Sequence, residues 1–370
     1  MMQHLKRFLI NGGLVAGSLL LSLLFCELVL FRFVFLPSDV PANAFVDGLV
    51  RYAPNQAGVW RVRNEIAAPY AINGQGWNSG TGDYVMARNP GVGRVAVVGD
   101  SMVEALQVAH DKSMGERLAA ELSGTDKPVE VYRFAVSGAP LSQYLNMIEH
   151  EVVRYRPDWI VVLLIHNDFD ESYRFVGGRY TSSFLKLRFE DGGVIREVPA
   201  VPWQPNASDW VRRTAIVRYM YYRWRVQVDA IRNWFLQSEQ TGERYEANID
   251  LQAVLGQMPS IAAATDHVFA RLAALGNGGS TRLLIAIDGV RDAIYTGSTS
   301  TALELNRLSA VLARKHGLPF VDLHSAFEED WSANHRRFEH MFDNHWNEYG
   351  HAVAARAVGQ AIKGAALQNP

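Results

Sequence analysis

The chain has 370 residues, which is long for one domain and short for three. Hydrophobic residues make up 48% and charged residues 20%, so a large core can form and wholesale disorder is excluded. The 36 Lys and Arg residues nearly balance the 38 Asp and Glu residues, and this balance gives no reason to expect nucleic acid as a partner. Cys26 is the only cysteine, which excludes a disulfide framework and a cysteine zinc site.

The N-terminal segment predicts a membrane helix. Phe8–Cys26 contains no charged residue, and the apolar run continues to Leu36, interrupted only by Glu27 and Arg32. About 20 apolar residues are enough to cross the hydrocarbon core of a bilayer. We therefore predict one transmembrane helix over residues 8–36.

The flanking charges predict the orientation of this helix. Lys6 and Arg7 precede the apolar run, and acidic residues follow it. The positive-inside rule then leaves residues 1–7 in the cytoplasm and the rest of the chain outside. Ala42–Ala44 has the small-x-small form of a signal-peptidase site, so removal of the helix is an open alternative, although the run exceeds the 7–15 residues or so of a signal peptide.

Beyond the helix, the pattern predicts a stem and one α/β domain. Residues 37–92 contain prolines and a glycine-rich stretch, which favour turns and a connecting stem. Residues 93–370 alternate short apolar runs with helical ones, and strands that are apolar on both faces belong in a parallel sheet covered by helices on each side. The predicted strands are Arg94–Val98, Val129–Phe134, Trp159–Ile165, Leu283–Ile287 and Pro319–Val321. The predicted helices are 112–122, 141–155, 251–275, 301–316 and 349–366. This order predicts an open α/β/α sandwich that binds ligands at the carboxyl ends of its strands.

One segment, about 171–250, breaks the alternation and is too long for a simple connection. Apolar residues recur in it at helical spacing, which predicts an amphipathic helix. They are Val217, Tyr221, Trp224, Val228, Ile231 and Phe235. Arg218, Arg225 and Arg232 form a basic stripe beside them. This helix is interpreted either as packing on the sandwich or as contacting anionic headgroups or an acidic glycan.

The first predicted strand leads directly into a candidate nucleophile. Arg94–Val98 is followed by Gly99, Asp100 and Ser101, and then by a helical stretch. A serine at this point faces the cleft, and its own backbone N–H can stabilise an oxyanion. The G-x-S-x-G elbow of the α/β-hydrolases is absent from the chain.

Polar residues and a glycine follow three further strands. Gly138 follows the second strand, where it lets the backbone approach a ligand closely. His166 and Asn167 follow the third, and the Asn167 side chain can donate a hydrogen bond into the same cleft. Asp288 follows the fourth. Asp100, His166 and Asp288 are candidate substrate contacts.

A general base is predicted near the C-terminus. Residues two apart in an extended segment point the same way, so Asp343 and His345 are expected to share the cleft with Ser101. Asn347 is expected to cap the final helix.

Taken together, these blocks resemble the SGNH or GDSL-like hydrolases. The resemblance rests on Gly99-Asp100-Ser101, Gly138, Asn167 and the Asp343/His345 pair, and it covers about residues 93–170 and 280–365. It implies a flavodoxin-like three-layer sandwich in which Ser101 is the nucleophile, His345 the general base and Asp343 the residue that orients the imidazole. It also implies an oxyanion hole made by the backbone N–H groups of Ser101 and Gly138 with the Asn167 side chain.

The sequence departs from the family pattern at two points. Ile165 stands where the family usually has a glycine, and the Asp and His are two residues apart instead of three. The closer pair, followed by Trp346 and Asn347, is similar to the membrane-associated branch that includes alginate O-acetylation proteins. This similarity implies a single-pass protein of a bacterial inner membrane that acts on the periplasmic side on an acylated polysaccharide.

We expect an esterase that cleaves an O-acyl ester and needs no cofactor. An O-acyltransferase shares the acyl-enzyme step and stays open as an alternative. Metal-dependent hydrolysis by His166 with Asp168, Asp170 and Glu171, or by His340 with Asp343, His345 and His351, is a weaker hypothesis, because the helical H-E-x-x-H spacing is absent. The third hypothesis is a non-catalytic, membrane-tethered scaffold that binds a glycan.

Overall fold

A five-stranded parallel sheet forms the centre of the protein, with strand order β13-β12-β7-β5-β6. The strands are β5 (Gly93–Gly99), β6 (Val129–Ala135), β7 (Trp159–Leu164), β12 (Arg282–Ile287) and β13 (Phe320–Asp322). The computed structural model describes residues 2–124, 127–174, 180–226, 245–247, 249–277 and 281–368. All residues of β5 and β7 are buried, as expected for strands that are covered on both faces. The predicted parallel sheet is confirmed.

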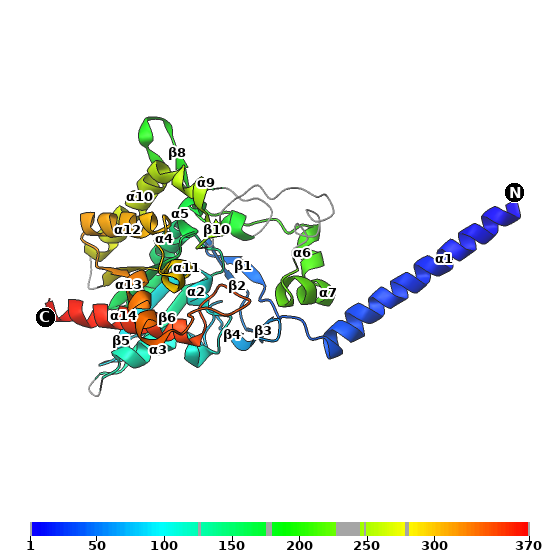
Figure 1. The fold of residues 1–370 in the computed structure, drawn as a ribbon, viewed down its shortest axis with the longest axis horizontal. Helices are drawn as coiled ribbons and strands as arrows, with labels where there is room; N and C mark the ends of the chain where they lie inside the picture. The colour runs from blue at the N-terminus through cyan, green and yellow to red at the C-terminus, as the bar shows by residue number, and fades with distance from the viewer. Residues whose placement is uncertain are drawn as a thin grey trace.

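Helices cover both faces of this sheet and complete a three-layer α/β/α sandwich (Figure 1). One face packs against α3 (Met114–Leu122), α13 (Leu323–Asn334) and α14 (Glu348–Gln368). The other face packs against α4 (Leu141–His150), α10 (Met258–Asn277) and α12 (Leu303–Lys315). Short helices occupy the connections, namely α2 (Ser101–Glu104), α5 (Asp168–Glu171), α9 (Leu251–Leu255) and α11 (Arg291–Thr296). The sequence did not indicate α13, because only Leu323 and Phe327 of this helix are buried and its apolar stripe is too thin to recognise.

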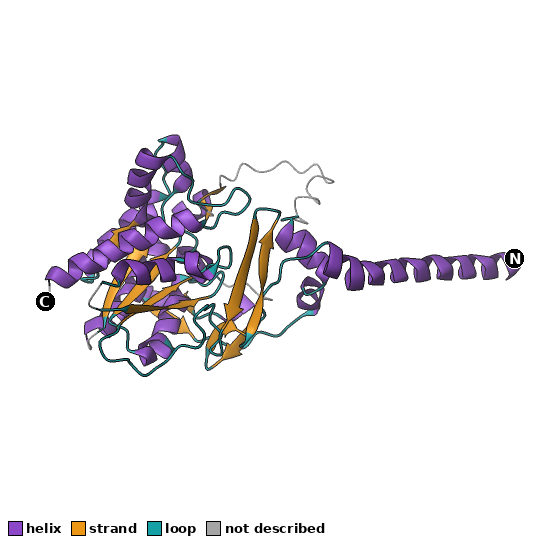
Figure 2. Ribbon diagram, turned by 90° about the horizontal axis from the view of Figure 1, so that it is seen from below, coloured by secondary structure: helices purple, strands orange, loops and turns teal. Residues whose placement is uncertain are grey.

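Residues 43–72, in the segment predicted to be a connecting stem, form two antiparallel hairpins. They are β1 (Asn43–Val46) with β2 (Leu49–Tyr52), and β3 (Gln56–Val62) with β4 (Ile66–Ile72). The hairpins lie on the side of the domain that faces the N-terminal helix (Figure 2). Leu49, Val50 and Trp77 are at most 1% exposed and share one core with α4. The stem is therefore part of the folded domain, and β4 of its second hairpin alternates strictly between buried and exposed residues.

The N-terminal helix is long and stands apart from the domain (Figure 1). It comprises α1 (Met2–Phe25), which continues as the π-helix η1 (Cys26–Val34). Its mean hydropathy is 2.4 over its most apolar stretch, none of which is buried, so it is long and apolar enough to cross a membrane. Its end contacts the insertion: Glu27 accepts hydrogen bonds from the backbone N–H groups of Ala215 (2.7 Å) and Ile216 (3.1 Å).

In the described part of the insertion, the predicted amphipathic helix is interrupted after Arg223. This part holds the hairpin of β8 (Lys186–Phe189) and β9 (Ile195–Val198), followed by α6 (Ala207–Arg212), α7 (Ala215–Val217) and the π-helix η6 (Arg218–Arg223). The helical segment η6 ends at Arg223, and the left-handed φ of +57° at Arg225 does not allow a regular helix to continue through that residue. Val228, Ile231, Arg232 and Phe235 lie outside the described residues. The short strands β10 (Tyr245–Glu246) and β11 (Ile249–Asp250) close the insertion.

Truncation of Leu49 tests whether the hairpins belong to the domain core. Leu49→Ala removes a fully buried side chain, so the free energy of unfolding should fall by about 2–5 kcal/mol. Val46→Ala, on the same hairpin but 36% exposed, should change it by no more than about 0.5 kcal/mol. Chemical denaturation of both variants measures the difference. Equal, small effects would mean that the hairpins are a loosely attached stem.

Candidate active site

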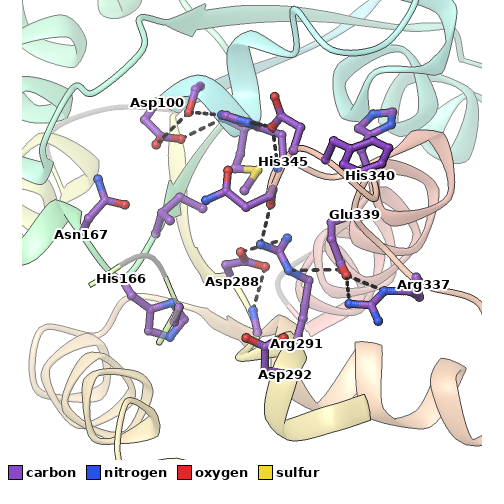
Figure 3. Close-up of a pocket in the computed structure, with 18 of the residues that line it drawn as sticks. Asp100, His166, Asn167, Asp288, Arg291, Asp292, Arg337, Glu339, His340 and His345 are labelled. Carbon is purple, nitrogen blue, oxygen red and sulfur yellow. Dashed lines mark hydrogen bonds and ion pairs between the residues drawn. The ribbon is translucent and has the colours of Figure 1, made fainter. Parts of the chain in front are cut away.

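A cavity of about 630 Å³ opens at the carboxyl edge of the central sheet. Its walls are the loops that follow β5, β6, β7 and β12, together with the segment 337–345 before α14. Figure 3 shows these side chains converging from separate elements. All the predicted catalytic, oxyanion-hole and substrate-contact residues line this cavity: Asp100, Ser101, Gly138, His166, Asn167, Asp288, Asp343 and His345. The predicted site is therefore brought together in one place.

Ser101 is the first residue of α2, directly after β5. Asp100 caps this helix, since its Oδ1 accepts a hydrogen bond of 2.9 Å from the backbone N–H of Met102. Gly99 allows the sharp turn, because a Cβ atom there would lie 2.4 Å from Val103 Cγ2. These local contacts hold the Ser101 hydroxyl at the edge of the cavity.

His345 and Asp343 face Ser101 from the segment before α14. His345 Nε2 lies 2.8 Å from Ser101 Oγ, and the other ring nitrogen, Nδ1, is hydrogen-bonded to Asp343 Oδ1. The same carboxylate oxygen accepts the backbone N–H of His345 at 3.0 Å. With Nδ1 held as a donor, Nε2 is left to accept the serine proton. The arrangement is the one predicted for a nucleophile, a base and an orienting carboxylate.

Arg225 of the insertion binds the second oxygen of Asp343. The Asp343 side chain is fully buried, and burial alone raises the pKa of a carboxyl group. The charge and hydrogen bonds of His345, together with the Arg225 guanidinium, outweigh burial and hold the pKa of Asp343 well below its usual range. Asp343 therefore stays ionised beside the imidazole. The sequence placed Arg225 only in a basic stripe, because nothing local shows that it reaches a residue 118 positions away.

Gly138 and Asn167 both line the cavity, and Asn167 lies on the opposite side from His340 (Figure 3). Gly138 has a φ of +70°, a conformation that glycine adopts without strain. Among the described residues, the Asn167 amide nitrogen makes one hydrogen bond, a long one of 3.5 Å to Glu171 Oε2. The loop that carries Asn167 is held by buried Asp168, which accepts hydrogen bonds from Ile165 N (2.7 Å) and Tyr144 Oη (2.8 Å). A weakly engaged amide on a firmly held loop is suited to bind an oxygen atom in the cavity.

The sequence matches the GDSL-like Lipase/Acylhydrolase family over residues 97–353, which is more than half of the chain. The chain belongs to this family. Membership makes it an SGNH-type enzyme that acts on ester bonds, in agreement with its parallel sheet and with the resemblance seen in its sequence. None of the curated proteins compared with this GDSL-like hydrolase matches it.

Solved structures similar to this hydrolase include several esterases, all distant in sequence. A two-domain esterase active on acetylated mannans has 10% identity and a TM-score of 0.41, covering 74% of this chain and 49% of its own. A lipase/acylhydrolase from Enterococcus faecalis has 12% identity and a TM-score of 0.40, covering 74% and 96%. An acetylxylan esterase from Geobacillus stearothermophilus has 13% identity and a TM-score of 0.39, covering 73% and 94%.

The three predicted substrate contacts of this hydrolase are buried and already have partners in the protein. Asp100 caps α2, and His166 Nε2 lies 2.9 Å from Asn306 Oδ1. Burial lowers the pKa of His166, which favours its neutral form. Asp288 accepts hydrogen bonds from Trp346 Nε1 (3.0 Å) and from the backbone N–H of Gly289 (2.8 Å). These side chains hold the loops around the cavity in place, and a direct contact with substrate stays a prediction.

Acidic and imidazole groups near the site do not gather as metal ligands. Among the described residues, no group of three or more His, Cys, Asp and Glu side chains is arranged to hold a metal ion. His351, for example, accepts a hydrogen bond from Met114 N in the contact between α14 and α3.

Glu104 is a buried carboxyl group next to the site that the sequence did not single out. It lies three residues after Ser101, accepts a 2.5 Å hydrogen bond from Ser137 Oγ and is bound by the Tyr52 hydroxyl. Burial raises its pKa to about 7. Glu104 thus ties the nucleophile helix to the loop of Gly138 and to the β2 hairpin. No local pattern reveals this role, because its partners come from distant segments.

The raised pKa of Glu104 predicts that the free energy of unfolding depends on pH. Glu104 binds its proton more tightly in the folded protein than in the unfolded chain. Its protonated form therefore stabilises the fold below about pH 4.5, and this stabilisation is lost as the pH rises through 7. The free energy of unfolding should fall by about 3 kcal/mol over this range. Glu104→Gln should flatten this decline, whereas Glu328→Gln, exposed on α13, should not. Denaturation at pH 4.5 to 8 provides the measurement. An unchanged decline in Glu104→Gln would show that Glu104 is ionised throughout.

Proposed function

We propose that this GDSL-like hydrolase is a membrane-anchored serine esterase that removes an O-acyl group from an envelope or exported polysaccharide. The observation that carries the proposal is the alignment of Ser101 Oγ, His345 and Asp343 at the carboxyl edge of the sheet, with 2.8 Å between the serine oxygen and the imidazole. The family supplies the class of reaction, and the site supplies the residues.

In the proposed mechanism, His345 Nε2 accepts the Ser101 proton while Oγ attacks the acyl carbon. The backbone N–H groups of Ser101 and Gly138 and the Asn167 amide stabilise the oxyanion, and each such donor contributes about 3–4 kcal/mol. His345 then protonates the departing sugar hydroxyl, which leaves an acyl group on Ser101. Water, activated by the same imidazole, releases the acid and restores the serine. Asp343, kept ionised by its surroundings, stabilises the imidazolium in both halves of the reaction.

The N-terminal helix supports the proposed location. Its length and hydropathy suit a membrane anchor, and the positive charges of Lys6 and Arg7 favour an orientation with the domain outside the cytoplasm. An O-acylated envelope or exported polysaccharide is the substrate that we propose for a domain on that side. A single-pass protein of a bacterial inner membrane with its domain in the periplasm is the arrangement we propose.

Transfer of the acyl group to a sugar hydroxyl is the second candidate function. The Asp343/His345 spacing of two residues favours it, because the O-acetylation branch that the sequence resembles has this spacing. Both reactions share the acyl-enzyme on Ser101 and differ in whether water or a saccharide resolves it. The products formed in the presence of an acceptor saccharide distinguish the two reactions. Hydrolysis releases the free acid, whereas transfer gives an acylated sugar.

Replacement of Ser101 tests the proposed nucleophile. With the full chain in detergent, Ser101→Ala should abolish turnover of p-nitrophenyl acetate and labelling by a fluorophosphonate probe, because it removes the oxygen that is proposed to attack. Ser332→Ala, at an exposed serine of α13, should retain both. Folded wild-type protein that neither turns over the ester nor reacts with the probe would contradict the proposal and favour a non-catalytic scaffold.

A further inference from the structure

Part of the insertion is rich in arginine and aromatic residues. Residues 207–225 contain five arginines and five Trp or Tyr residues against one acidic residue, Asp209. Arg225 is bound at the catalytic site and Arg218 is paired with Asp39 at 3.1 Å, but the other arginines have no part in the proposed mechanism. Trp and Tyr are enriched at the headgroup level of membranes, and anionic lipids attract arginine. This composition is typical of a segment that lies on a membrane surface.

The same segment is fixed to the end of the anchor helix. Glu27 of η1 accepts hydrogen bonds from the first two backbone N–H groups of α7. Tyr219 of η6 packs against two side chains of the anchor, with its ring centroid 5.0 Å from that of Phe31 and 5.8 Å from that of Phe35. Both α7 and η6 therefore lie against η1, at a fixed level along the anchor.

The length of the anchor relates this level to the membrane surface. The uncharged run Phe8–Cys26 has 19 residues, or about 28 Å of helix, which is close to the hydrocarbon thickness of about 30 Å. Glu27 is the first charged residue after this run, so η1 begins where the hydrocarbon core ends. Figure 1 shows α6 and α7 beside this end of the anchor. With the anchor across a membrane, both short helices lie at the level of the lipid headgroups.

At that level, α6 has an exposed surface that is apolar and basic. Trp210 is 68% exposed and Val211 is 56% exposed. Arg213 is also exposed, and its guanidinium carbon lies 5.4 Å from the centroid of the Trp210 ring. A capping box made by Asn206 and Asp209 fixes the start of this helix. A tryptophan ring beside an arginine suits the boundary between hydrocarbon and phosphate, where each finds its preferred surroundings.

We infer that α6 docks on the membrane surface next to the anchor, with Trp210 and Val211 among the lipid headgroups. Arg212 and Arg213 bind the phosphates of anionic phospholipids. This inference rests on the proposed membrane location and adds a second contact to the anchor helix. A domain attached by one helix can tilt, whereas two contacts fix the height of the catalytic cavity above the membrane. The docked segment also carries the arginine that binds Asp343, so it contacts the catalytic site directly.

Quenching of a fluorescent label by lipid tests this docking. The full-length chain carries Cys26→Ser and one new cysteine labelled with NBD, placed by Ala207→Cys on α6, by Leu20→Cys on the anchor or by Ser332→Cys at an exposed position of α13. The nanodiscs contain phosphatidylcholine, phosphatidylglycerol and a doxyl-labelled lipid. The Ala207 label should be quenched by the lipid at least about threefold more than the Ser332 label, and it should be protected from iodide in the water. The Leu20 label reports insertion of the anchor.

Substitutions on α6 test which side chains bind the lipid. Arg212→Gln/Arg213→Gln should lower the equilibrium constant for docking about fivefold for each arginine removed, and omission of phosphatidylglycerol should also lower it. Trp210→Ser should weaken docking in either lipid, because it removes the ring that lies among the headgroups. The matched control Arg314→Gln/Lys363→Gln removes the same charge from exposed sites on α12 and α14 and should match the parent protein.

Three results would overturn the inference while the Leu20 label is quenched. Equal quenching of the Ala207 and Ser332 labels would show that the anchor inserts without docking of α6. Protection of the Ala207 label from iodide without quenching by lipid would show that a protein, such as a second copy of this chain, covers α6. Equal quenching with and without phosphatidylglycerol would exclude the anionic headgroup.

Two further readouts separate this inference from the proposed function. A Leu20 label that lipid does not quench would contradict the proposed anchor and the docking together. Turnover of p-nitrophenyl acetate, measured in the same nanodiscs, tests the esterase independently, because its loss would count against the proposed reaction whatever the position of α6.

Discussion

The hydrogen bond between Ser101 and His345 joins two segments that are 244 residues apart in the chain, and the site depends on keeping both in place. Ser101 is held by β5 and by the cap that Asp100 forms on α2. The position of His345 is fixed by its neighbour Trp346. This side chain is fully buried and donates its indole N–H to Asp288, which follows β12. The central sheet therefore sets the distance between the proposed nucleophile and the proposed base, and buried loop residues fix the loops that carry them.

Buried acidic side chains fix the loops at three strand ends. Asp100 follows β5, Asp168 lies just after β7 and Asp288 follows β12, and each accepts backbone N–H groups of its own loop. An ionisable group that is buried and well bonded rigidifies the backbone around it, because leaving its partners unsatisfied would be costly. Glu104 adds a connection to the first hairpins, and Arg225 adds one to the insertion. The first hairpins thus contact the site through a hydrogen bond to Glu104, and the insertion contacts it through the ion pair of Arg225.

Much of this was predictable from the sequence, because the information is local. The apolar strands predicted the parallel sheet, and residues directly after strands predicted Ser101, Gly138 and Asn167. The Asp343/His345 pair and the cap by Asn347, which accepts the backbone N–H of Tyr349 at 2.9 Å, follow from spacing and residue type. The remaining features depend on tertiary contacts. The hairpins of residues 43–72 were obscured by their turn residues, and neither Glu104 nor Arg225 carries a local signal of its distant partner.

The most direct test of this account is a double-mutant cycle on Ser101 and His345. If the two residues act as one unit, Ser101→Ala and His345→Ala should each lower kcat/KM for p-nitrophenyl acetate by about 10⁴-fold or more, and the double variant should be no slower than Ser101→Ala alone. Losses that multiply in the double variant would show that the two residues act independently. That result would contradict the catalytic unit on which the rest of the interpretation depends.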